Sequence, residues 1–334
     1  MPKLGGLGVA VLGSGMAVPG KVVTNQDLEK MVDTSDQWIV ERTGIRTRFV
    51  AEEGVLTSDI SEEASRMALE RAGISPEDLD LILVGTNSPD TLFPSVAAKL
   101  QGRLGAVKAG AADVQSGCTG SLYALAMGAS FVASGVFKYI LVVGAEVLSR
   151  LVDWNDRNTC VLFGDGAGAV VLGPARDEGL SGRVLGFSLK ADGAKHDLIT
   201  LMGGLVEHPA SHETVDQGLH WVKMKGNDVF KFVNREIPPF LDGFLGEMGF
   251  APGDVSSWVF HQANWRIMEG VLRRLGVPEE RAVVNLDKYG NTSCASIMMA
   301  LHEAIVSGRI RKGDKVVISS FGAGMTYGAM LMEF

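Results

Sequence analysis

Short apolar runs and longer segments of helical length alternate along this chain of 334 residues. The N-terminal run 1–13 (MPKLGGLGVAVLG) predicts a first strand, and the runs 139–145 (YILVVGA) and 315–321 (KVVISSF) predict buried strands. The segments 121–135 and 296–308, which precede those two strands, predict helices. Strands that alternate with helices are typical of a mainly parallel sheet covered by helices.

The second half of the chain repeats the pattern of the first. Residues 73–85 and 249–261 both read as the end of a helix, a turn with proline and a buried strand, at an offset of 176 residues. The helices 121–135 and 296–308 follow at an offset of 173. The first carries no charge and the second only one glutamate and one histidine, which indicates burial on all sides. Two such halves predict a five-layered α/β/α/β/α fold with these helices in the middle layer.

The repeat also predicts the domain organisation. It divides the chain into an N-terminal half, residues 1–174, and a C-terminal half, residues 175–334. Residues of about 175–225 find no counterpart in the first half and are rich in glycine, histidine and aspartate. They predict an insertion whose loops cover a site.

Composition and charge exclude several classes of function. The chain is 46% hydrophobic and 21% charged, which is ordinary for a globular protein. Its net charge of −8 argues against nucleic-acid binding, which needs a cationic surface. It shows no apolar run of membrane-spanning length and no features of a signal peptide at its start, so a cytoplasmic location is expected. Three scattered cysteines predict neither a disulfide framework nor a metal site.

Cys118 is the first candidate for chemistry. It lies in the segment 114–126 (VQSGCTGSLYALA), between a predicted strand and the uncharged helix. The positive end of a helix dipole lowers the pKa of a cysteine at that position, and a thiolate is the competent nucleophile. The alternative is that Cys118 is a small buried hydrophobic residue. Cys160 and Cys294 are both interpreted as packing residues.

His261 and Asn291 are the two further candidates. His261 ends a buried strand and opens the polar run His-Gln-Ala-Asn, and Asn291 lies in a turn before the second buried helix. When the two halves are aligned at the repeat offsets, Cys118 is equivalent to Asn291, and His261 is equivalent to Gly85. All three therefore occupy comparable turns at strand ends and helix starts, where α/β folds bind ligands. Taken singly, a structural histidine and an N-cap asparagine remain open alternatives.

Several longer runs resemble one enzyme family over essentially the full length of the chain. The chain is similar to β-ketoacyl-acyl-carrier-protein synthase III, a condensing enzyme with a thiolase-like fold. The matching runs are 33–48 (DTSDQWIVERTGIRTR), 163–172 (FGDGAGAVVL), 261–267 (HQANWRI), 289–296 (YGNTSCAS) and 321–328 (FGAGMTYG).

The resemblance implies a catalytic triad of Cys118, His261 and Asn291. It implies that an acyl group passes from coenzyme A to Cys118, and that a malonyl group on acyl carrier protein then loses carbon dioxide and condenses with it. This reaction begins type II fatty acid synthesis. The resemblance implies no bound cofactor, because coenzyme A enters as a thioester substrate, and it implies a homodimer.

The resemblance also assigns outer contacts. The residues implied to contact coenzyme A are Thr34, Trp38, Arg42, Arg157 and Asn264, with Trp38 and Arg157 on the two faces of the adenine. Gly322 and Gly324 belong to the loop implied to form an oxyanion hole with the backbone of Cys118. The implied acyl pocket contains Phe93, donated across the dimer interface, and Ser121 and Met325, which both replace the family's usual aromatic residues. The basic residues implied to dock the acidic carrier protein are Lys231, Arg266, Arg273 and Arg274.

Four other functions compete with this interpretation. A thiolase needs a second cysteine in the C-terminal glycine loop, and 321–328 has none. A 3-hydroxy-3-methylglutaryl-coenzyme A synthase needs a glutamate where Asn87 stands. A related Cys-His-Asn acyltransferase of secondary metabolism, with a different acceptor, remains the alternative. A non-catalytic subunit is disfavoured by the intact Cys-His-Asn set.

Overall fold

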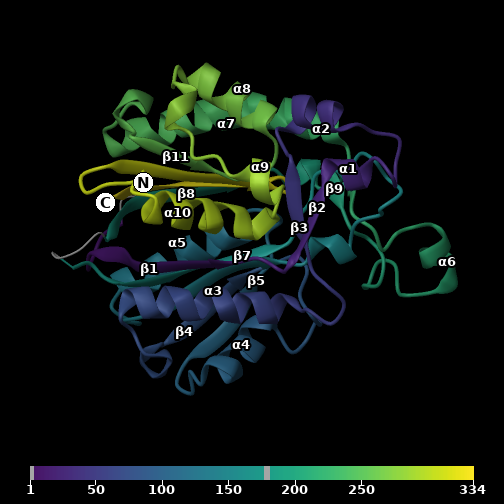
Figure 1. Cartoon of the computed structure of the whole chain (residues 1–334). Helices are drawn as coiled ribbons and strands as arrows, with labels where there is room; N and C mark the ends of the chain where they lie inside the picture. Colours follow the sequence, from purple (N-terminus) through teal and green to yellow (C-terminus); the bar gives the residue numbers. More distant parts are fainter. Residues whose placement is uncertain (1–3, 177–180) are drawn as a thin grey trace.

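The chain folds into five layers, with two helices packed between two portions of one sheet (Figure 1). The structure is a computed structural model and describes residues 4–176 and 181–334. The sheet order is β5-β4-β6-β7-β1-β8-β13-β12-β11. Its strands are β1 (Val9–Ala17), β4 (Leu81–Gly85), β5 (Gly110–Val114), β6 (Ile140–Glu146), β7 (Gly166–Pro174), β8 (Gly182–Ala191), β11 (Ser257–Phe260), β12 (Lys315–Gly322) and β13 (Thr326–Glu333).

Helices form the middle layer and the two outer layers (Figure 1). The middle helices are α5 (Gly120–Ala133) and α10 (Ser296–Val306), and both are largely buried, as their lack of charge predicts. The outer layers are α3 (Thr57–Ala72) with α4 (Val96–Leu104) on one side, and α7 (Gly226–Met248) with α8 (Trp265–Leu275) on the other. The smaller elements are β2 (Lys21–Thr24), α1 (Asn25–Leu28), α2 (Asp36–Thr43), β3 (Thr47–Val50), β9 (Ile199–Thr200), α6 (His212–Asp216), β10 (Lys223–Met224) and α9 (Leu286–Tyr289).

The two halves of the sheet have the same strand order, which confirms the duplication. In the first half the order is β5-β4-β6-β7-β1, and in the second half it is β11-β12-β13-β8. β11, β12, β13 and β8 are therefore equivalent to β4, β6, β7 and β1. Ala282, which bridges Trp258 of β11 in parallel, stands where β5 stands in the first half. The halves meet where β1 pairs with β8 over two residue pairs.

The expectation of a mainly parallel sheet is wrong, because the sheet is mixed. Only the pairs β4–β5, β4–β6 and β11–β12 are parallel among the described strands. β7 and β13 return beside β6 and β12 without a crossover helix, so they pair antiparallel.

The stretch 175–225, expected to be an insertion, contains a strand of the main sheet. β8 pairs with β13 along its length and holds the place in the second half that β1 holds in the first. The excursion therefore begins after Ala191 rather than at residue 175. It carries the short helix α6, which projects from the body of the molecule (Figure 1).

The closeness of the sheet to the buried helices depends on glycine. A side-chain carbon on Gly144 of β6 would collide with the carbonyl of Cys294, and one on Gly168 of β7 would collide with Met298 of α10. Both glycines let α10 and the turn before it lie directly on the sheet. In the described residues, no helix combines the length and the apolar character that crossing a membrane requires.

Candidate active site

Cys118, His261 and Asn291 lie at three turns between strands and the buried helices. Cys118 lies between β5 and α5, and His261 directly follows β11. Asn291 lies between α9 and the short turn that leads into α10. His261 and Asn291 are buried, and Cys118 is partly exposed.

Two serines join the three candidate residues. The backbone N–H of Ser293 donates to Asn291 Oδ1 over 2.9 Å. The carbonyl of Ser293 accepts from Ser296 Oγ over 2.8 Å, and Ser296 Oγ lies 2.7 Å from His261 Nδ1. The side chain of Ser293 lies beside the thiol of Cys118 and lowers its pKa. The structure therefore brings the three predicted residues together, and the links are serines that the sequence reasoning missed.

Ser293 adopts an unusual backbone conformation. Its φ of 47° makes it the one described residue other than glycine in the left-handed region. Such a conformation costs about 1–3 kcal/mol and persists where the surroundings hold it. Here the conformation lets one residue present its N–H, carbonyl and hydroxyl to three different side chains. The strain is stored at the point where the candidate residues meet.

The thiol of Cys118 has a raised pKa, contrary to the expectation from the helix dipole. Burial raises the pKa of Cys118 to about 12, the Ser293 hydrogen bond opposes this rise, and the carboxylate of Glu146 adds to it. The dipole of α5 favours a thiolate by a smaller amount than desolvation disfavours it. The candidate nucleophile therefore rests as a thiol and would need a base to react.

His261 is suited to be that base. Burial lowers the pKa of His261 to about 3, so its imidazole is neutral near pH 7. Its ring lies edge-on to Phe321, with ring centroids 5.4 Å apart, and its backbone N–H donates to Ser319 O over 2.8 Å. The end of β12 thus fixes the ring from one side and Ser296 from the other. A neutral, oriented imidazole can accept a proton or donate one.

The glycine loop after β12 packs on the backbone of Cys118. A side-chain carbon on Gly322 would collide with the Cys118 backbone nitrogen, and one on Gly117 would lie 2.5 Å from Ala323 N. Ser320 Oγ donates to the carbonyl of Cys118 over 2.9 Å. Gly324, the other loop residue assigned by resemblance, has a φ of 127° that favours glycine. The loop and the candidate nucleophile therefore form one unit.

Trp38 and Arg157 lie against each other on the surface. The guanidinium carbon of Arg157 is 4.5 Å from the centre of the Trp38 ring, and Arg42 approaches the same ring at 5.9 Å. Arg157 also pairs with Asp33 at 3.6 Å. An adenine between two flat groups needs them about 7 Å apart, twice the contact distance. Arg157 must therefore swing away from Trp38 before a base can enter.

Thr34 and Asn264 are the remaining predicted contacts for coenzyme A. The hydroxyl oxygen of Thr34 is buried and has no hydrogen-bond partner among the described residues. Asn264 is the N-cap of α8, and its Oδ1 accepts from the backbone N–H of Arg266 over 2.9 Å. The amide nitrogen of Asn264 remains available to a ligand, while its oxygen is occupied by the cap.

The three predicted acyl-pocket residues do not gather in this single chain. Ser121 is fully buried, and its hydroxyl donates to the carbonyl of Cys294 over 2.6 Å, so it ties α5 to the turn before α10. Met325 is also fully buried, and its backbone pairs with Asp192. Phe93 is 82% exposed, on the loop before α4. Their role in an acyl pocket stays a prediction.

The predicted docking residues divide into two groups. Lys231, Arg266 and Arg273 are exposed, and Lys231 makes only a surface pair with Asp228 at 3.5 Å. Arg274 instead donates to the carbonyl of Asn234 on α7 over 2.6 Å. That bond ties α8 to α7, so Arg274 is engaged in the protein and is less suited to a partner than its neighbours.

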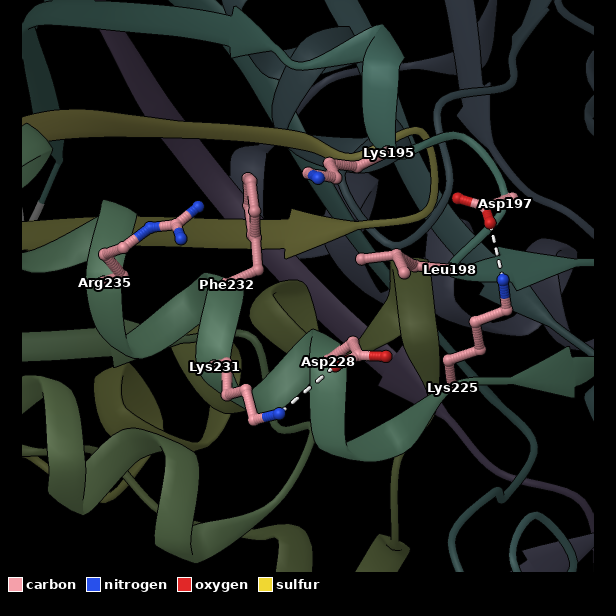
Figure 2. Close-up of a pocket in the computed structure, with 8 residues that line it drawn as sticks. All are labelled: Lys195, Asp197, Leu198, Lys225, Asp228, Lys231, Phe232 and Arg235. Atoms are coloured by element: carbon pink, nitrogen blue, oxygen red, sulfur yellow. Dashed lines mark hydrogen bonds and ion pairs between the residues drawn. The ribbon is translucent and has the colours of Figure 1, made fainter.

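A hollow of about 320 Å³ lies beside Lys231, and Figure 2 shows its lining side chains. Three further cations line it: Lys195, Lys225 and Arg235. Two aspartates also line the hollow. Asp197 pairs with Lys225, and Asp228 pairs with Lys231. The sequence reasoning missed these cations, although a spacing of four residues places Arg235 beside Lys231 on α7.

The other two cysteines are buried, and one lies beside the candidate site. Cys160 packs in the core formed by α7, α8 and their neighbours. The Cys294 thiol donates to the carbonyl of Gly117 over 3.0 Å. Cys294 therefore packs directly under the loop that carries Cys118.

Comparison with known proteins identifies the family. Residues 112–193 match the family described as 3-oxoacyl-[acyl-carrier-protein (ACP)] synthase III, and residues 245–334 match its C-terminal part. The chain is 48% identical over 326 residues, 98% of each chain, to a β-ketoacyl-[acyl-carrier-protein] synthase III of Desulfitobacterium hafniense.

Solved structures agree with the sequence comparison. The 3-oxoacyl-[acyl-carrier-protein] synthase III of Aquifex aeolicus superposes with a TM-score of 0.89 at 41% identity, over 98% of this chain and all of the other. A priming β-ketosynthase of the R1128 polyketide pathway superposes with a TM-score of 0.90 at 32% identity, over 98% of this chain and 97% of the other. The five-layered fold, the matched motifs and these likenesses agree: the chain belongs to the β-ketoacyl-acyl-carrier-protein synthase III family of condensing acyltransferases.

Proposed function

We propose that this protein condenses an acyl-coenzyme A primer with malonyl-acyl-carrier protein, with loss of carbon dioxide, to give a 3-oxoacyl-carrier protein. This reaction begins type II fatty acid synthesis. The observation that carries the proposal is the connection of Cys118, His261 and Asn291 through Ser293 and Ser296. The alternative role in secondary metabolism is less favoured, because the polyketide ketosynthase is 32% identical and the relative from Desulfitobacterium 48%.

The first half-reaction loads Cys118. The sulfur attacks the thioester carbonyl of acyl-coenzyme A while neutral His261 accepts the thiol proton. The backbone N–H of Cys118 and the Gly322–Gly324 loop stabilise the oxyanion that forms. When the tetrahedral intermediate collapses, His261 returns the proton to the leaving coenzyme A thiolate. The products are an acyl thioester on Cys118 and free coenzyme A.

The second half-reaction forms the new carbon–carbon bond. Loss of carbon dioxide from the malonyl thioester leaves an enolate, whose oxygen accepts hydrogen bonds from the Asn291 amide and His261. The Ser296 hydroxyl faces both His261 Nδ1 and the carbonyl of Ser293. When the hydroxyl donates to that carbonyl, Nδ1 can carry the ring proton and Nε2 can accept one. When the hydroxyl turns to donate to Nδ1, Nε2 carries the proton and can donate it. The carbanion attacks the acyl thioester, and the thiolate released from Cys118 takes one proton from solvent.

The proposed reaction uses no bound cofactor, because the nucleophile, base and hydrogen-bond donors all belong to the chain. Its proposed location is the cytoplasm, where thiols such as Cys118 stay reduced. We also propose that the duplicated halves divide at residues 174 and 175, just after β7 ends.

The proposed assembly is a homodimer formed through the edge strand β5. Among the described strands β5 pairs only with β4, which leaves its outer edge open in that part of the chain. Leu92, Phe93 and Val107, near this edge strand in the sequence, are between 68% and 82% exposed. An open strand edge beside exposed apolar side chains suits pairing with a second copy. In such a dimer Phe93 would reach the acyl pocket of the partner.

The proposed docking surface for the carrier protein consists of Lys231, Arg266 and Arg273, extended by the cations of the hollow in Figure 2. Acyl carrier proteins are acidic, so a local cationic surface on a chain of net charge −8 would orient them.

The proposed function is tested by measuring the mass of the intact protein after incubation with acyl-coenzyme A thioesters of different chain length. The expected result is the mass of one acyl group on Cys118, which also reveals the preferred primer. Addition of malonyl-carrier protein should then remove that mass and yield a 3-oxoacyl-carrier protein. Cys118→Ser should not load. An acyl group on Cys160 or Cys294 would overturn the assignment.

A further inference from the structure

Glu146 is a buried carboxylate without a cationic partner among the described residues. It is the last residue of β6 and is fully inaccessible. It accepts hydrogen bonds from Ser88 Oγ at 2.5 Å, Thr86 Oγ1 at 3.4 Å and the backbone N–H of Asn87 at 3.1 Å. Buried charges are normally paired or used. The turn after β4 therefore supplies polar donors to a charge that the reaction described above does not employ.

Asn87 connects this carboxylate to the candidate nucleophile. Its Nδ2 donates to Glu146 Oε1 over 2.7 Å and to the carbonyl of Gly117 over 3.0 Å. The same nitrogen lies 3.3 Å from Ser293 Oγ. Gly117 directly precedes Cys118, and the side chain of Ser293 lowers the pKa of the Cys118 thiol. The amide of Asn87, held by Glu146, thus contacts both Gly117 and Ser293, which lie on either side of the Cys118 sulfur.

We propose that Glu146 and Asn87 are a positioning pair that fixes the Cys118 loop and Ser293 and places a carboxylate behind the nucleophile. The proposal rests on the proposed function only in taking Cys118 as the nucleophile. Neither residue touches the substrate; both act through Cys118 and Ser293. Asn87 supplies the geometric link, and Glu146 supplies the anchor for Asn87 and the charge.

The charge opposes formation of the thiolate. The carboxylate of Glu146 raises the pKa of Cys118 and also that of Cys294. The other titratable groups around these residues are His261, which is neutral, and Asp165, directly before β7, whose pKa is also raised by burial and by Glu146. The resting cysteine therefore keeps its proton until a bound thioester and His261 draw it away, which protects the sulfur from oxidants and electrophiles.

The decisive variant is Glu146→Gln, which removes the charge and keeps the shape. The measurement is the rate at which iodoacetamide alkylates Cys118, followed on its peptide by mass spectrometry between pH 7 and 10, where only a small fraction of the thiol is ionised. The rate at each pH should rise several-fold, because a nearby like charge has been removed, while kcat for condensation falls.

The matched control is Asp165→Asn, which neutralises another fully buried carboxylate held only by hydrogen bonds. Asp165 accepts from Ser149 Oγ, Ser149 N and Ala51 N. This variant should lose stability like Glu146→Gln but keep the wild-type alkylation rate at each pH. A rate unchanged in Glu146→Gln, or raised equally in both variants, overturns the proposal.

Asn87→Ala separates the link from the charge. It keeps Glu146 but removes the amide, so kcat should fall at least tenfold while the KM for acyl-coenzyme A changes little. Full activity in Asn87→Ala would also overturn the proposal, and this variant serves if Glu146→Gln does not fold. Alkylation needs no substrate, so its rate can rise even if no acyl transfer is found. The positioning pair and the proposed reaction therefore fail independently.

Discussion

The backbone N–H of Ser293 holds the side-chain oxygen of Asn291 at 2.9 Å and thereby decides which way the amide faces. Because the oxygen is occupied, the amide nitrogen points away from this contact, and it has no hydrogen-bond acceptor among the described residues. A held oxygen and a free N–H₂ make Asn291 a preoriented donor, which is what stabilisation of an enolate requires.

Asn291→Asp should separate the two half-reactions. The carboxylate keeps the size of the amide but has no donor, and its charge repels the enolate. We expect decarboxylation of malonyl-carrier protein to fall by roughly 10²–10³-fold. Loading of Cys118 from acyl-coenzyme A should change less than tenfold. The measurements are carbon dioxide release and intact mass, and equal losses in both steps would contradict this assignment.

Ser296→Ala should disturb His261 without removing it. The hydroxyl lies 2.7 Å from Nδ1 and fixes the ring orientation. Its loss should lower kcat by at least tenfold and leave the KM for acyl-coenzyme A unchanged, because binding groups are untouched. Ser296→Thr, which keeps a hydroxyl, is the matched control and should retain more activity. A raised KM for acyl-coenzyme A with an unchanged kcat would contradict this role of Ser296.

Stability should fall in acid because His261 is buried in its neutral form. The folded-state pKa of about 3 lies below the ordinary value of 6.5, so the unfolded chain binds a proton that the folded chain does not. This costs stability as the pH falls below about 6.5, by about 2 kcal/mol at pH 5. His261→Asn should flatten the dependence of the unfolding free energy on pH between 7.5 and 5. An unchanged slope in denaturant titrations would contradict the buried neutral state.

Charge reversal should distinguish docking from folding. Arg266→Glu and Arg273→Glu should raise the KM for malonyl-carrier protein several-fold and weaken its dependence on salt, with loading from acyl-coenzyme A little changed. Arg274→Ala should mainly lower the melting temperature, because this side chain joins α8 to α7. Lys312→Glu, an exposed cation on another surface, is the control. Equal effects of Lys312→Glu would show a general charge effect instead of a docking surface.

Phe93 should be required for assembly or for the acyl pocket, but not for folding. We expect the wild-type protein to sediment as a dimer. Phe93→Asp should weaken the dimer or the acyl-chain preference while leaving the melting temperature of the fold close to that of the wild type, since the side chain is 82% exposed within one chain. A stable and fully active monomer would exclude the proposed interface.

The sequence could predict the features that repeat or that sit at strand ends. The offset of 173–176 residues located both buried helices, and the same offset placed Cys118 and Asn291 at equivalent turns. Strand direction was less accessible, because apolar runs of similar length form both the parallel strands and the returning strands β7 and β13. β8 was assigned to an insertion because its sequence shows no likeness to β1, although the two strands hold equivalent places.

The electrostatics of the site could not be read from local sequence. The start of a helix favours a thiolate at Cys118, but the opposing desolvation comes from residues distant in the chain, and so does the charge of Glu146. Likewise Ser293 and Ser296 have no periodicity that marks them, and their importance follows from the atoms they touch. Arg274 is exposed, but its contact with the carbonyl of Asn234 depends on how α7 and α8 pack, which the local sequence does not show.

The duplicated architecture divides the chemistry unequally between its halves. The first half contributes the sulfur, and the second contributes the imidazole, the amide and the glycine loop, although the positions of Cys118 and Asn291 are equivalent by symmetry. Neither half expressed alone should therefore be active, because the first half lacks the imidazole and the amide and the second half lacks the thiol. Two identical halves would hold the same residue at both turns, so they could not present a thiol at one turn and an amide at the other.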